Sequence, residues 1–439
     1  MPNTTLLSET RQALAARLAD ARAGTDHLFS ILTPEALYER PIPERHRLIF
    51  YLGHLEAFDW NLARQVFGME SFQPEFDKLF AFGIDPIGGG LPNEPKSDWP
   101  PAAAVRSYNE RARRRIDEAL RDSRPPRGGN DLDEILHMAI EHRLMHAETL
   151  AYLFHQLPYE AKIAPGGVNA PSPTGEVRMR AAPVPAGTAT LGRARERGGF
   201  GWDNEFDAHR VEVPAFSIDS HKVSNGRFLE FVRDRGYEDR RHWSDAAWDW
   251  KEREGFRHPH FWRARDGAWT YVGLFAEVPM PLDAPVYVSH AEASAFARWA
   301  GGALPTEAQY HRAAYGTPEG REREYPWGSE APSPRHGNFD MKLWDPTRLG
   351  AFPDGDSAFG ISELVGNGWE WTSSVFAPFD GFRAHPLYEG YSANFFDGQH
   401  FVQKGASPRT AACMLRRSFR NWFQPHYRYV YAGFRLTHP

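Results

Sequence analysis

The chain has 439 residues, enough for two or three domains of about 100 to 200 residues each. Its formal net charge is -6 and no run of Lys or Arg stands out, which gives no electrostatic reason to expect nucleic acid or an anionic membrane as partner. The single cysteine, Cys413, excludes an intrachain disulfide and a thiolate cluster, so a metal site would depend on His, Asp or Glu.

Neither an export signal nor a membrane-spanning segment is visible in the sequence. Residues 1–20 lack a contiguous apolar stretch, and nowhere do about 18 apolar residues follow one another. We therefore expect a cytoplasmic enzyme that acts on small molecules.

Four stretches of the first third have apolar residues at three- and four-residue spacing, which predicts helices over 8–32, 46–67, 101–123 and 135–157. Ser8 stands where it can cap the first of them. Residues 77–101 are dense in Gly and Pro and predict a long loop. Four amphipathic helices form an up-and-down bundle, which can hold a metal between facing helices. We expect this domain over residues 1–160.

Two histidines of the fourth predicted helix, His142 and His146, are four residues apart. This spacing places both imidazoles on one helix face, about 5–6 Å apart at Cβ. Such a pair also arises by chance, and then both are ordinary half-buried histidines. His54 in the second predicted helix offers a third imidazole, and three imidazoles suit Fe(II), Zn or Ni while leaving coordination positions for substrates.

Other side chains near these histidines have several alternative roles. Glu141 and Glu148 are competing ligands or acceptors for the imidazole N–H groups. His137 and His155 lie on the same predicted helix but off the face of the pair, so we expect them in solvent or in the core. His46 precedes His54 by two helical turns and could line the same cavity.

The composition changes after the fourth helix. Residues 161–183 are rich in Pro and Gly without periodicity, which predicts a linker. From residue 184 to 439, short apolar stretches alternate with turn residues, and helices are expected only over 224–235, 290–300 and 306–315. Many aromatic residues and little regular structure favour a compact, irregular α+β domain. The fold class is therefore multidomain, α followed by α+β.

Ten short motifs of the second half follow one another in a recognisable order. They begin at Val184, Asp203, Val223, Pro285, Ala297, Leu304, Tyr325, Leu364, Lys404 and Ala432. This series resembles the formylglycine-generating-enzyme-like fold, a C-type-lectin-like domain. The generating enzymes need a pair of cysteines, so the lone Cys413 excludes that activity.

A DinB-like four-helix bundle with His54 and His142-x-x-x-His146 in front of this fold resembles the ergothioneine- and ovothiol-type sulfoxide synthases. The resemblance implies a nonheme Fe(II) enzyme that uses O2 to join a thiol to the imidazole ring of histidine or histidine betaine, leaving a sulfoxide. The thiol would be cysteine or a related molecule. His54, His142 and His146 would be the iron ligands.

The resemblance also implies roles for residues of the second half. Asn421 and Trp422 match positions that contact the histidine-derived substrate, and an aromatic face suits a trimethylammonium group. Tyr388 and Tyr391 lie in the segment where one branch of the family places a tyrosine that donates a proton or an electron. The sequence does not decide between these two tyrosines.

Four further residues are candidates for binding substrate. Arg416 and Arg420 offer planar guanidinium groups for a substrate carboxylate. Phe423 follows Arg-Asn-Trp, at a position where the family branch that uses γ-glutamylcysteine tends to have an acidic residue. Met145 occupies a position where a residue with an amide side chain is common in the family.

Two alternatives remain open from the sequence. The same scaffold could use a selenium nucleophile or only oxidise a thiol. A protein of a different class, a non-enzymatic binding module stabilised by a metal, is the other alternative. The candidate residues come from both halves of the chain, so we expect both halves to be needed for the reaction.

Overall fold

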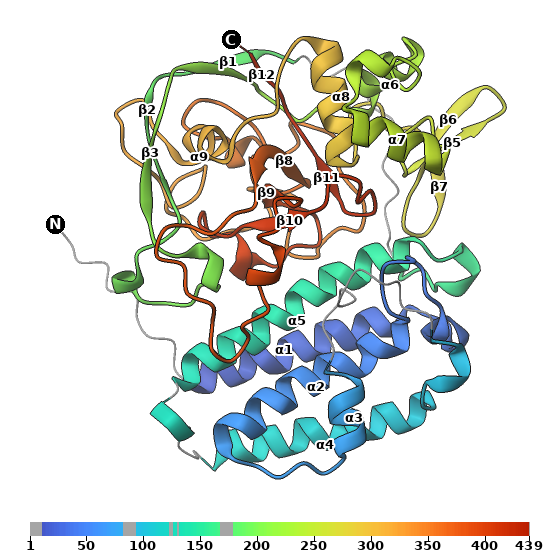
Figure 1. The fold of residues 1–439 in the computed structure, drawn as a ribbon, viewed down its shortest axis with the longest axis vertical. Helices are drawn as coiled ribbons and strands as arrows, with labels where there is room; N and C mark the ends of the chain where they lie inside the picture. The colour runs from blue at the N-terminus through green and yellow to red at the C-terminus, as the bar shows by residue number, and fades with distance from the viewer. Residues whose placement is uncertain (1–10, 82–93, 123–125, 130, 167–178, 439) are drawn as a thin grey trace. The chain divides into compact units, whose positions relative to one another are not determined.

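The computed structural model describes residues 11–81, 94–122, 126–129, 131–166 and 179–438, and the chain divides into two compact units (Figure 1). The helical unit comprises Met1–Gly166 with Gly198–Phe200, and the β-rich unit comprises Gly167–Arg197 with Gly201–Pro439. The division between Gly166 and Gly167 falls inside the range predicted as linker.

The helical unit is built around four long helices (Figure 1): α1 (Arg11–Ser30), α2 (Leu48–Phe67), α4 (Ala102–Arg121) and α5 (Leu132–His155). Helix α1 packs against α5, and α2 packs against both α4 and α5. The apolar residues that predicted each helix form the core, among them Leu14 and Leu18 of α1 and Leu150 of α5. The predicted helical bundle is confirmed.

Local signals account for the ends of these helices. The Asp131 side chain accepts a hydrogen bond from the Asp133 amide at 3.0 Å, so α5 starts three residues before the predicted position. Helix α2 ends at Phe67 and is capped by Gly68, whose φ of 62° lies in the left-handed region that glycine adopts without strain. Ser8 lies outside the described residues.

A short helix, α3 (Pro74–Leu79), follows α2. Its N-terminal Pro74 and the acidic Glu75 and Asp77 of its first turn favour helix initiation. The predicted loop over 77–101 is therefore wrong at its start, and residues 82–93 lie outside the described residues. The remaining short elements are 3-10 helices: η1 (Pro34–Tyr38), η2 (Lys96–Asp98), η3 (Arg127–Gly129) and η4 (Tyr159–Ala161).

The β-rich unit contains four small sheets in its described part. They are β1 (Ala181–Val184) with β4 (Phe216–Asp219) and β12 (Thr437–His438); β2 (Gly187–Leu191) with β3 (His209–Val213); β5 (Trp262–Arg265), β6 (Ala268–Val272) and β7 (Glu277–Pro279); and β8 (Gly368–Val375), β9 (Phe401–Ala406), β10 (Asn421–Phe423) and β11 (Ala432–Gly433). Strand β1 begins inside the range predicted as linker, because Ala181 to Val184 pair with β4.

The sheet of order β10-β9-β8-β11 positions the candidate substrate residues. Strand β9 is antiparallel to both β8 and β10, while β11 runs parallel to β8. In this register Gln403 of β9 pairs with Asn421 of β10 on one side and with Trp371 of β8 on the other. Asn421 and Trp422 are therefore fixed by a strand edge and not by a free loop.

Four helices accompany these sheets in the described residues: α6 (Asn225–Arg233), α7 (Asp245–Glu254), α8 (His290–Ala300) and α9 (Glu307–Tyr315). Each begins after a Ser or Thr whose side chain accepts a hydrogen bond from the first turn. Helix α7 was not predicted, because only Trp250 and Lys251 of its residues are buried and no apolar periodicity results.

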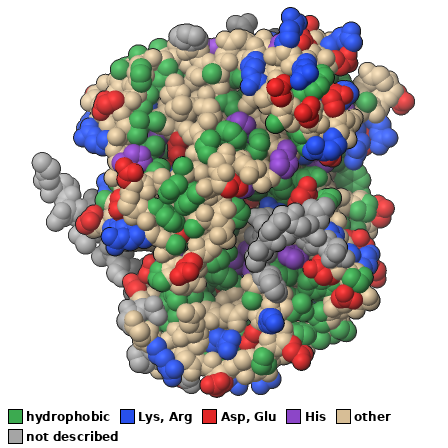
Figure 2. All heavy atoms as spheres, viewed as in Figure 1, with side chains coloured by type: hydrophobic (Ala, Val, Ile, Leu, Met, Phe, Trp, Pro, Cys, Tyr) green, Lys and Arg blue, Asp and Glu red, His purple; other side chains and the backbone are tan. Residues whose placement is uncertain are grey.

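Aromatic side chains fill much of this unit's interior, as the sequence predicts. Trp202, Trp262 and Trp371 are among its largest fully buried side chains. Over α6 and α7, acidic and basic side chains lie next to one another on the surface (Figure 2). Just before α7, Arg240 forms an ion pair with Asp245. Among the described residues, no helix has both the length and the apolarity needed to cross a membrane.

Candidate functional site

Three histidines of the helical unit come together between two helices. His54 is on α2, and His142 and His146 are one turn apart on α5. Each offers one ring nitrogen, and these three atoms all lie within 4.8 Å of one another. Among the described residues this is the only group of three or more His, Cys, Asp or Glu side chains that could hold a metal ion in this way.

The three imidazoles are buried and neutral at physiological pH. His54 is 3% exposed and the other two are each 2% exposed. Burial lowers the pKa of His54 to about 4 and lowers the pKa of His142 and His146 well below their usual range. A neutral imidazole is the form that binds a metal, so the cluster does not have to release protons when an ion enters.

A backbone contact determines which nitrogen of His54 is available. Its Nδ1 lies 2.7 Å from the carbonyl oxygen of Phe80. Because a carbonyl only accepts, Nδ1 carries the hydrogen, and Nε2 keeps its lone pair. Nε2 is buried and has no hydrogen-bond partner within the described part of the chain. An imidazole oriented by a carbonyl in this way is typical of a metal ligand.

Gly53 makes this orientation possible. A Cβ at this position would lie 2.5 Å from the ring of Phe80, which is closer than side-chain atoms can approach. The ring of Phe80 therefore packs directly on the α2 backbone beside His54. This packing brings the Phe80 carbonyl to the imidazole.

Aromatic rings enclose the cluster. Phe58 stacks on His142 with ring centroids 3.5 Å apart, and Phe50 stacks on His54 at 4.9 Å. The ring centroids of Tyr51 and His146 are 5.9 Å apart. These contacts restrict rotation of the imidazoles and exclude water, which strengthens any electrostatic interaction at the site.

The remaining side chains that the sequence singled out here lie outside the cluster. His155 is buried in the core, and His137 is half-buried and stacks on Phe200 with ring centroids 5.6 Å apart, as expected for histidines without a ligand role. His46 packs on Phe50, the ring that also covers His54. Glu141 is buried, while Glu148 and Met145 are half-buried.

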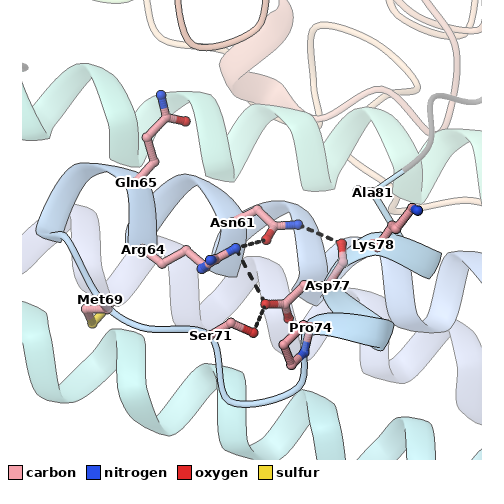
Figure 3. A pocket seen from close by; sticks show the side chains of 9 residues that line it. All are labelled: Asn61, Arg64, Gln65, Met69, Ser71, Pro74, Asp77, Lys78 and Ala81. Carbon is pink, nitrogen blue, oxygen red and sulfur yellow. Dashed lines mark hydrogen bonds and ion pairs between the residues drawn. The ribbon is translucent and has the colours of Figure 1, made fainter.

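A cavity of about 560 Å³ also opens on the helical unit (Figure 3). It lies along α2 and α3 and contains none of the predicted site residues. Two of its charged side chains are paired with each other, since Arg64 donates to Asn61 at 3.2 Å and lies 3.6 Å from Asp77. Asp77 in turn accepts from Ser71 at 2.6 Å. We therefore assign no ligand to this cavity.

In the β-rich unit, the segment with the candidate tyrosines is tied to residues 202–204. Tyr391 stacks on Trp202 with ring centroids 4.0 Å apart. Asn204 donates to Ser392 at 2.9 Å, and Ser392 donates to Asp203. Tyr388 lies farther from Trp202, at 6.4 Å between ring centroids. Of the two tyrosines, Tyr391 has the closer ring contact with Trp202.

Trp422 and Asn421 form one wall with Tyr391. The ring of Trp422 stacks on Phe376 at 4.1 Å and meets Tyr391 edge-on at 5.5 Å. Asn421 donates from its side chain to Oε1 of Gln403 at 3.1 Å. Gln403 is fully buried and was not predicted, since its pairing with Asn421 depends on a strand register that no local motif encodes.

Both candidate arginines are held by carboxylates of the same unit. Arg416 pairs with Glu205 through two of its nitrogens. Burial raises the pKa of Glu205, but the guanidinium of Arg416 outweighs this effect and keeps the pKa below its usual value. Arg420 is 3% exposed, donates to Glu307 at 3.1 Å, and lies over the ring of Phe376. Both guanidinium groups are therefore engaged within the unit, and Arg420 also contacts the ring that stacks on Trp422.

Phe423 completes the strand after Trp422. Its ring stacks on Tyr427 with centroids 5.0 Å apart and an interplanar angle of 10°. The ring is half-buried, so this position presents an apolar and not a charged group.

Two family models match the chain. The sulfatase-modifying factor enzyme 1-like domain matches residues 171–438, and the DinB superfamily matches residues 17–150. The two matches correspond to the β-rich and the helical unit.

Similar curated proteins share both units or one of them. The chain is 34% identical over 442 residues to hercynine oxygenase of Mycolicibacterium smegmatis, an alignment that covers 97% of this chain and 99% of that protein. It is 41% identical over 237 residues to hercynine oxygenase of Mycobacterium tuberculosis, covering 54% of this chain and 55% of that protein. Ergothioneine biosynthesis protein 1 of Neurospora crassa is 27% identical over 502 residues, covering 93% of this chain and 55% of that protein. The chain thus spans about half the length of the last two relatives.

Proposed function

The chain belongs to the family of ergothioneine-type sulfoxide synthases, and from this premise we propose that it is an Fe(II)-dependent oxidoreductase that uses O2. Its reaction joins a thiol to the imidazole ring of histidine or of its trimethylated betaine and gives a sulfoxide. The observation that supports this function most strongly is the buried cluster of His54, His142 and His146.

The residues present fit such a metal. All three donors are nitrogens of neutral, buried imidazoles, and Nε2 of His54 has a lone pair with no hydrogen-bond partner among the described residues. A divalent ion held by three imidazoles supplies open coordination positions for substrates, which is the chemistry that a structural zinc site lacks. The aromatic rings around the cluster keep the ligands oriented and keep water out.

The β-rich unit is proposed to bind the histidine-derived substrate. The face of Trp422 suits a trimethylammonium group through a cation–π contact of about 1–2 kcal/mol. Its ring is already fixed by Phe376, and the Asn421 amide is fixed by Gln403, so little side-chain freedom is lost on binding.

Tyr391 is the better candidate for the proton donor. Its ring contacts both Trp202 and Trp422, so its hydroxyl group is held in a defined place next to the substrate wall. A positioned phenol can deliver the proton of Oη to a reacting oxygen. Tyr388 is the alternative donor.

The second substrate is inferred to be cysteine or a similarly small thiol. Arg416 and Arg420 are engaged by Glu205 and Glu307, so neither guanidinium is available for an additional carboxylate without breaking an internal pair. Phe423 adds an apolar surface where a charged recognition group would otherwise stand.

The test is reconstitution with Fe(II) under anaerobic conditions, followed by addition of histidine betaine, cysteine and O2. Mass spectrometry of the product and measurement of O2 uptake distinguish a sulfoxide with a new C–S bond from an oxidised thiol, and a selenium donor can be offered in parallel. We expect the sulfoxide from the parent chain and none from His142→Ala. His155→Ala is the matched control, because His155 is buried on the same helix but lies outside the cluster.

Two results would contradict the proposal. Full turnover by His142→Ala would contradict the assignment of His142 as a metal ligand. Stable metal binding without O2 uptake across a panel of histidine derivatives and thiols would favour a non-enzymatic binding module.

A further inference from the structure

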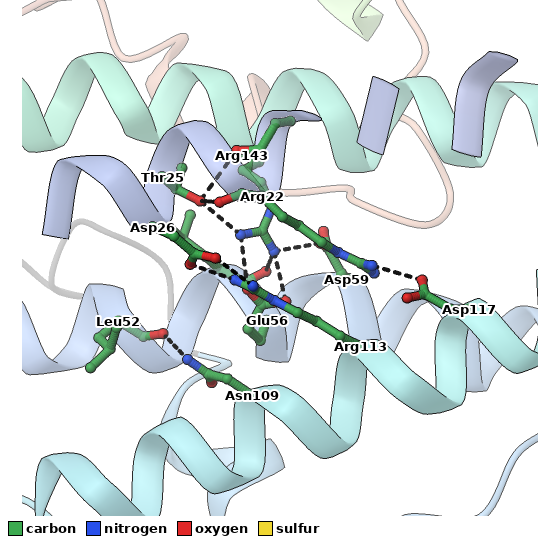
Figure 4. A network of polar contacts seen from close by, with 12 residues as sticks. Arg22, Thr25, Asp26, Leu52, Glu56, Asp59, Asn109, Arg113, Asp117 and Arg143 are labelled. Carbon is green, nitrogen blue, oxygen red and sulfur yellow. Dashed lines mark hydrogen bonds and ion pairs between the residues drawn. The ribbon is translucent and has the colours of Figure 1, made fainter. Parts of the chain in front are cut away.

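Next to the histidine cluster, the bundle holds three charged side chains away from water (Figure 4). Arg143 of α5 is 0% exposed, and Glu56 and Asp59 of α2 are 1% and 3% exposed. We call these residues the ion triad. A buried charge is costly unless it is paired and hydrogen-bonded, so their burial requires a well-defined arrangement.

The guanidinium of Arg143 makes four bonds with two of its nitrogens. Nη1 donates to Oε1 of Glu56 at 2.9 Å and to the hydroxyl of Thr25 at 3.2 Å. Nη2 donates to Oδ2 of Asp59 at 2.6 Å and to the carbonyl oxygen of Leu55 at 3.0 Å. Because the group is planar, these bonds form together only when α5 has one height and one rotation relative to α2.

The same two helices carry the histidines at the same level. Arg143 directly follows His142, and Glu56 stands two residues after His54. Each residue of an α-helix advances about 1.5 Å along the axis and turns by about 100°. A slide of α5 by one residue would break the bonds of Arg143 and also separate the ligand atoms, which now lie within 4.8 Å of one another.

Stability alone does not explain why this position is charged. Buried ion pairs can often be replaced by apolar side chains of similar volume without loss of stability, whereas a buried polar group can specify the register of packed helices. Apolar contacts between α2 and α5 are non-directional and tolerate small displacements. The directional hydrogen bonds of Arg143 do not tolerate such displacements.

We propose that Arg143, with Glu56 and Asp59, is the positioning unit of the metal centre, because it fixes the register of α5 on α2 in which the three histidines converge. This inference rests on the proposed function only in that the histidines bind a metal. It assigns no contact with substrate to the triad, which acts through His54, His142 and His146.

The outer part of the same network provides a control. Arg113 of α4 bonds to Glu56 at 2.5 Å and to both oxygens of Asp26, at 2.6 and 2.8 Å. Its side chain is 25% exposed, and it makes no bond between α2 and α5. Arg113→Met therefore removes a charge from the network without removing the bonds that set the register.

The experiment measures Co(II) binding to the full chain, by competition with a chelator and by the visible spectrum of the bound ion. The main variant, Arg143→Met/Glu56→Leu/Asp59→Leu, removes all three charges together, so that no buried charge is left unpaired. We expect parental helicity, a Co(II) affinity lower by about 10- to 100-fold, the usual effect of removing groups that orient metal ligands, and an altered spectrum. Arg113→Met should keep the parental affinity and spectrum.

A second variant covers the case in which the triple variant does not fold. Arg143→Lys keeps the charge but loses the planar donor group, and it should also bind Co(II) more weakly with an altered spectrum. Parental affinity and spectrum in either folded variant would overturn the proposal, as would an equal loss in Arg113→Met. Failure of the reaction with histidine betaine would not affect these Co(II) results, so the two proposals fail separately.

Discussion

The candidate site residues of the helical unit and those of the β-rich unit differ in how their polar groups are paired. In the helical unit, the His54 nitrogen that faces the cluster has no hydrogen-bond partner in the described structure, and the ring of Phe50 stacks on the imidazole. In the β-rich unit, the candidate arginines are already paired with Glu205 and Glu307. The difference indicates which groups are available for an external ligand and which ones support the site.

The largest effect is expected on turnover, from a variant that tests whether the β-rich unit also supplies a reactive group. Tyr391→Phe removes only the hydroxyl group and keeps the stacking on Trp202. If Oη delivers a proton, turnover should fall by about 10²- to 10⁴-fold while metal content stays constant. Steady-state rates of this variant and of Tyr388→Phe provide the comparison. A loss only in Tyr388→Phe would transfer the role to Tyr388.

The next effect concerns stability and tests whether Arg416 is a supporting group. Arg416→Met leaves the carboxylate of Glu205 buried without its cation, which should cost about 3–5 kcal/mol in the free energy of unfolding. Arg265→Met removes an exposed pair with Glu277 and should cost less than about 1 kcal/mol. Chemical denaturation measures both. Parental stability with a raised KM for the thiol would instead make Arg416 a substrate ligand.

Trp422→Ala should have a smaller effect, confined to substrate binding. Loss of a cation–π contact of about 1–2 kcal/mol corresponds to a roughly 10-fold weaker binding of histidine betaine. Metal content should remain parental, because the three histidines belong to the other unit. Isothermal titration with the betaine checks the first expectation and elemental analysis checks the second. Loss of iron with normal betaine affinity would contradict the division of roles.

The smallest expected effect is a change in pH dependence. Burial alone would raise the pKa of Glu205, but the guanidinium of Arg416 lowers this pKa in the folded chain. The folded state therefore prefers the ionised form, and this stabilisation is present above the pKa of the unfolded chain and is lost as the pH falls below it. Glu205→Gln should flatten the decline of the unfolding free energy as the pH falls from about 5 through the lowered pKa of Glu205. An unchanged slope would show that the pair does not control acid stability.

The helices were largely predictable because their apolar periodicity reflects the core that they form. The predicted helix over 135–157 corresponds to Leu132–His155, and the spacing of His142 and His146 placed them on one face. Helix α7 escaped prediction because it is mostly exposed, and α3 because a segment of six residues shows no period.

The supporting contacts of the site were not predictable in the same way. Arg143 stands between His142 and Leu144 of α5, and its sequence neighbours do not reveal that Glu56 and Asp59 meet it across the bundle. Gln403 reaches Asn421 only through the pairing of β9 with β10. Such contacts join residues far apart in the chain, so they depend on the fold and not on a local pattern.

The most direct test of the account is the metal content of single alanine variants in the full chain, measured by elemental analysis after Fe(II) loading and gel filtration. We predict that His54→Ala, His142→Ala and His146→Ala each lose most of the iron, because each removes one of three converging nitrogens. His137→Ala and His155→Ala, two histidines of the same helix outside the cluster, should retain it. Full iron retention by any of the first three variants would contradict the three-histidine centre.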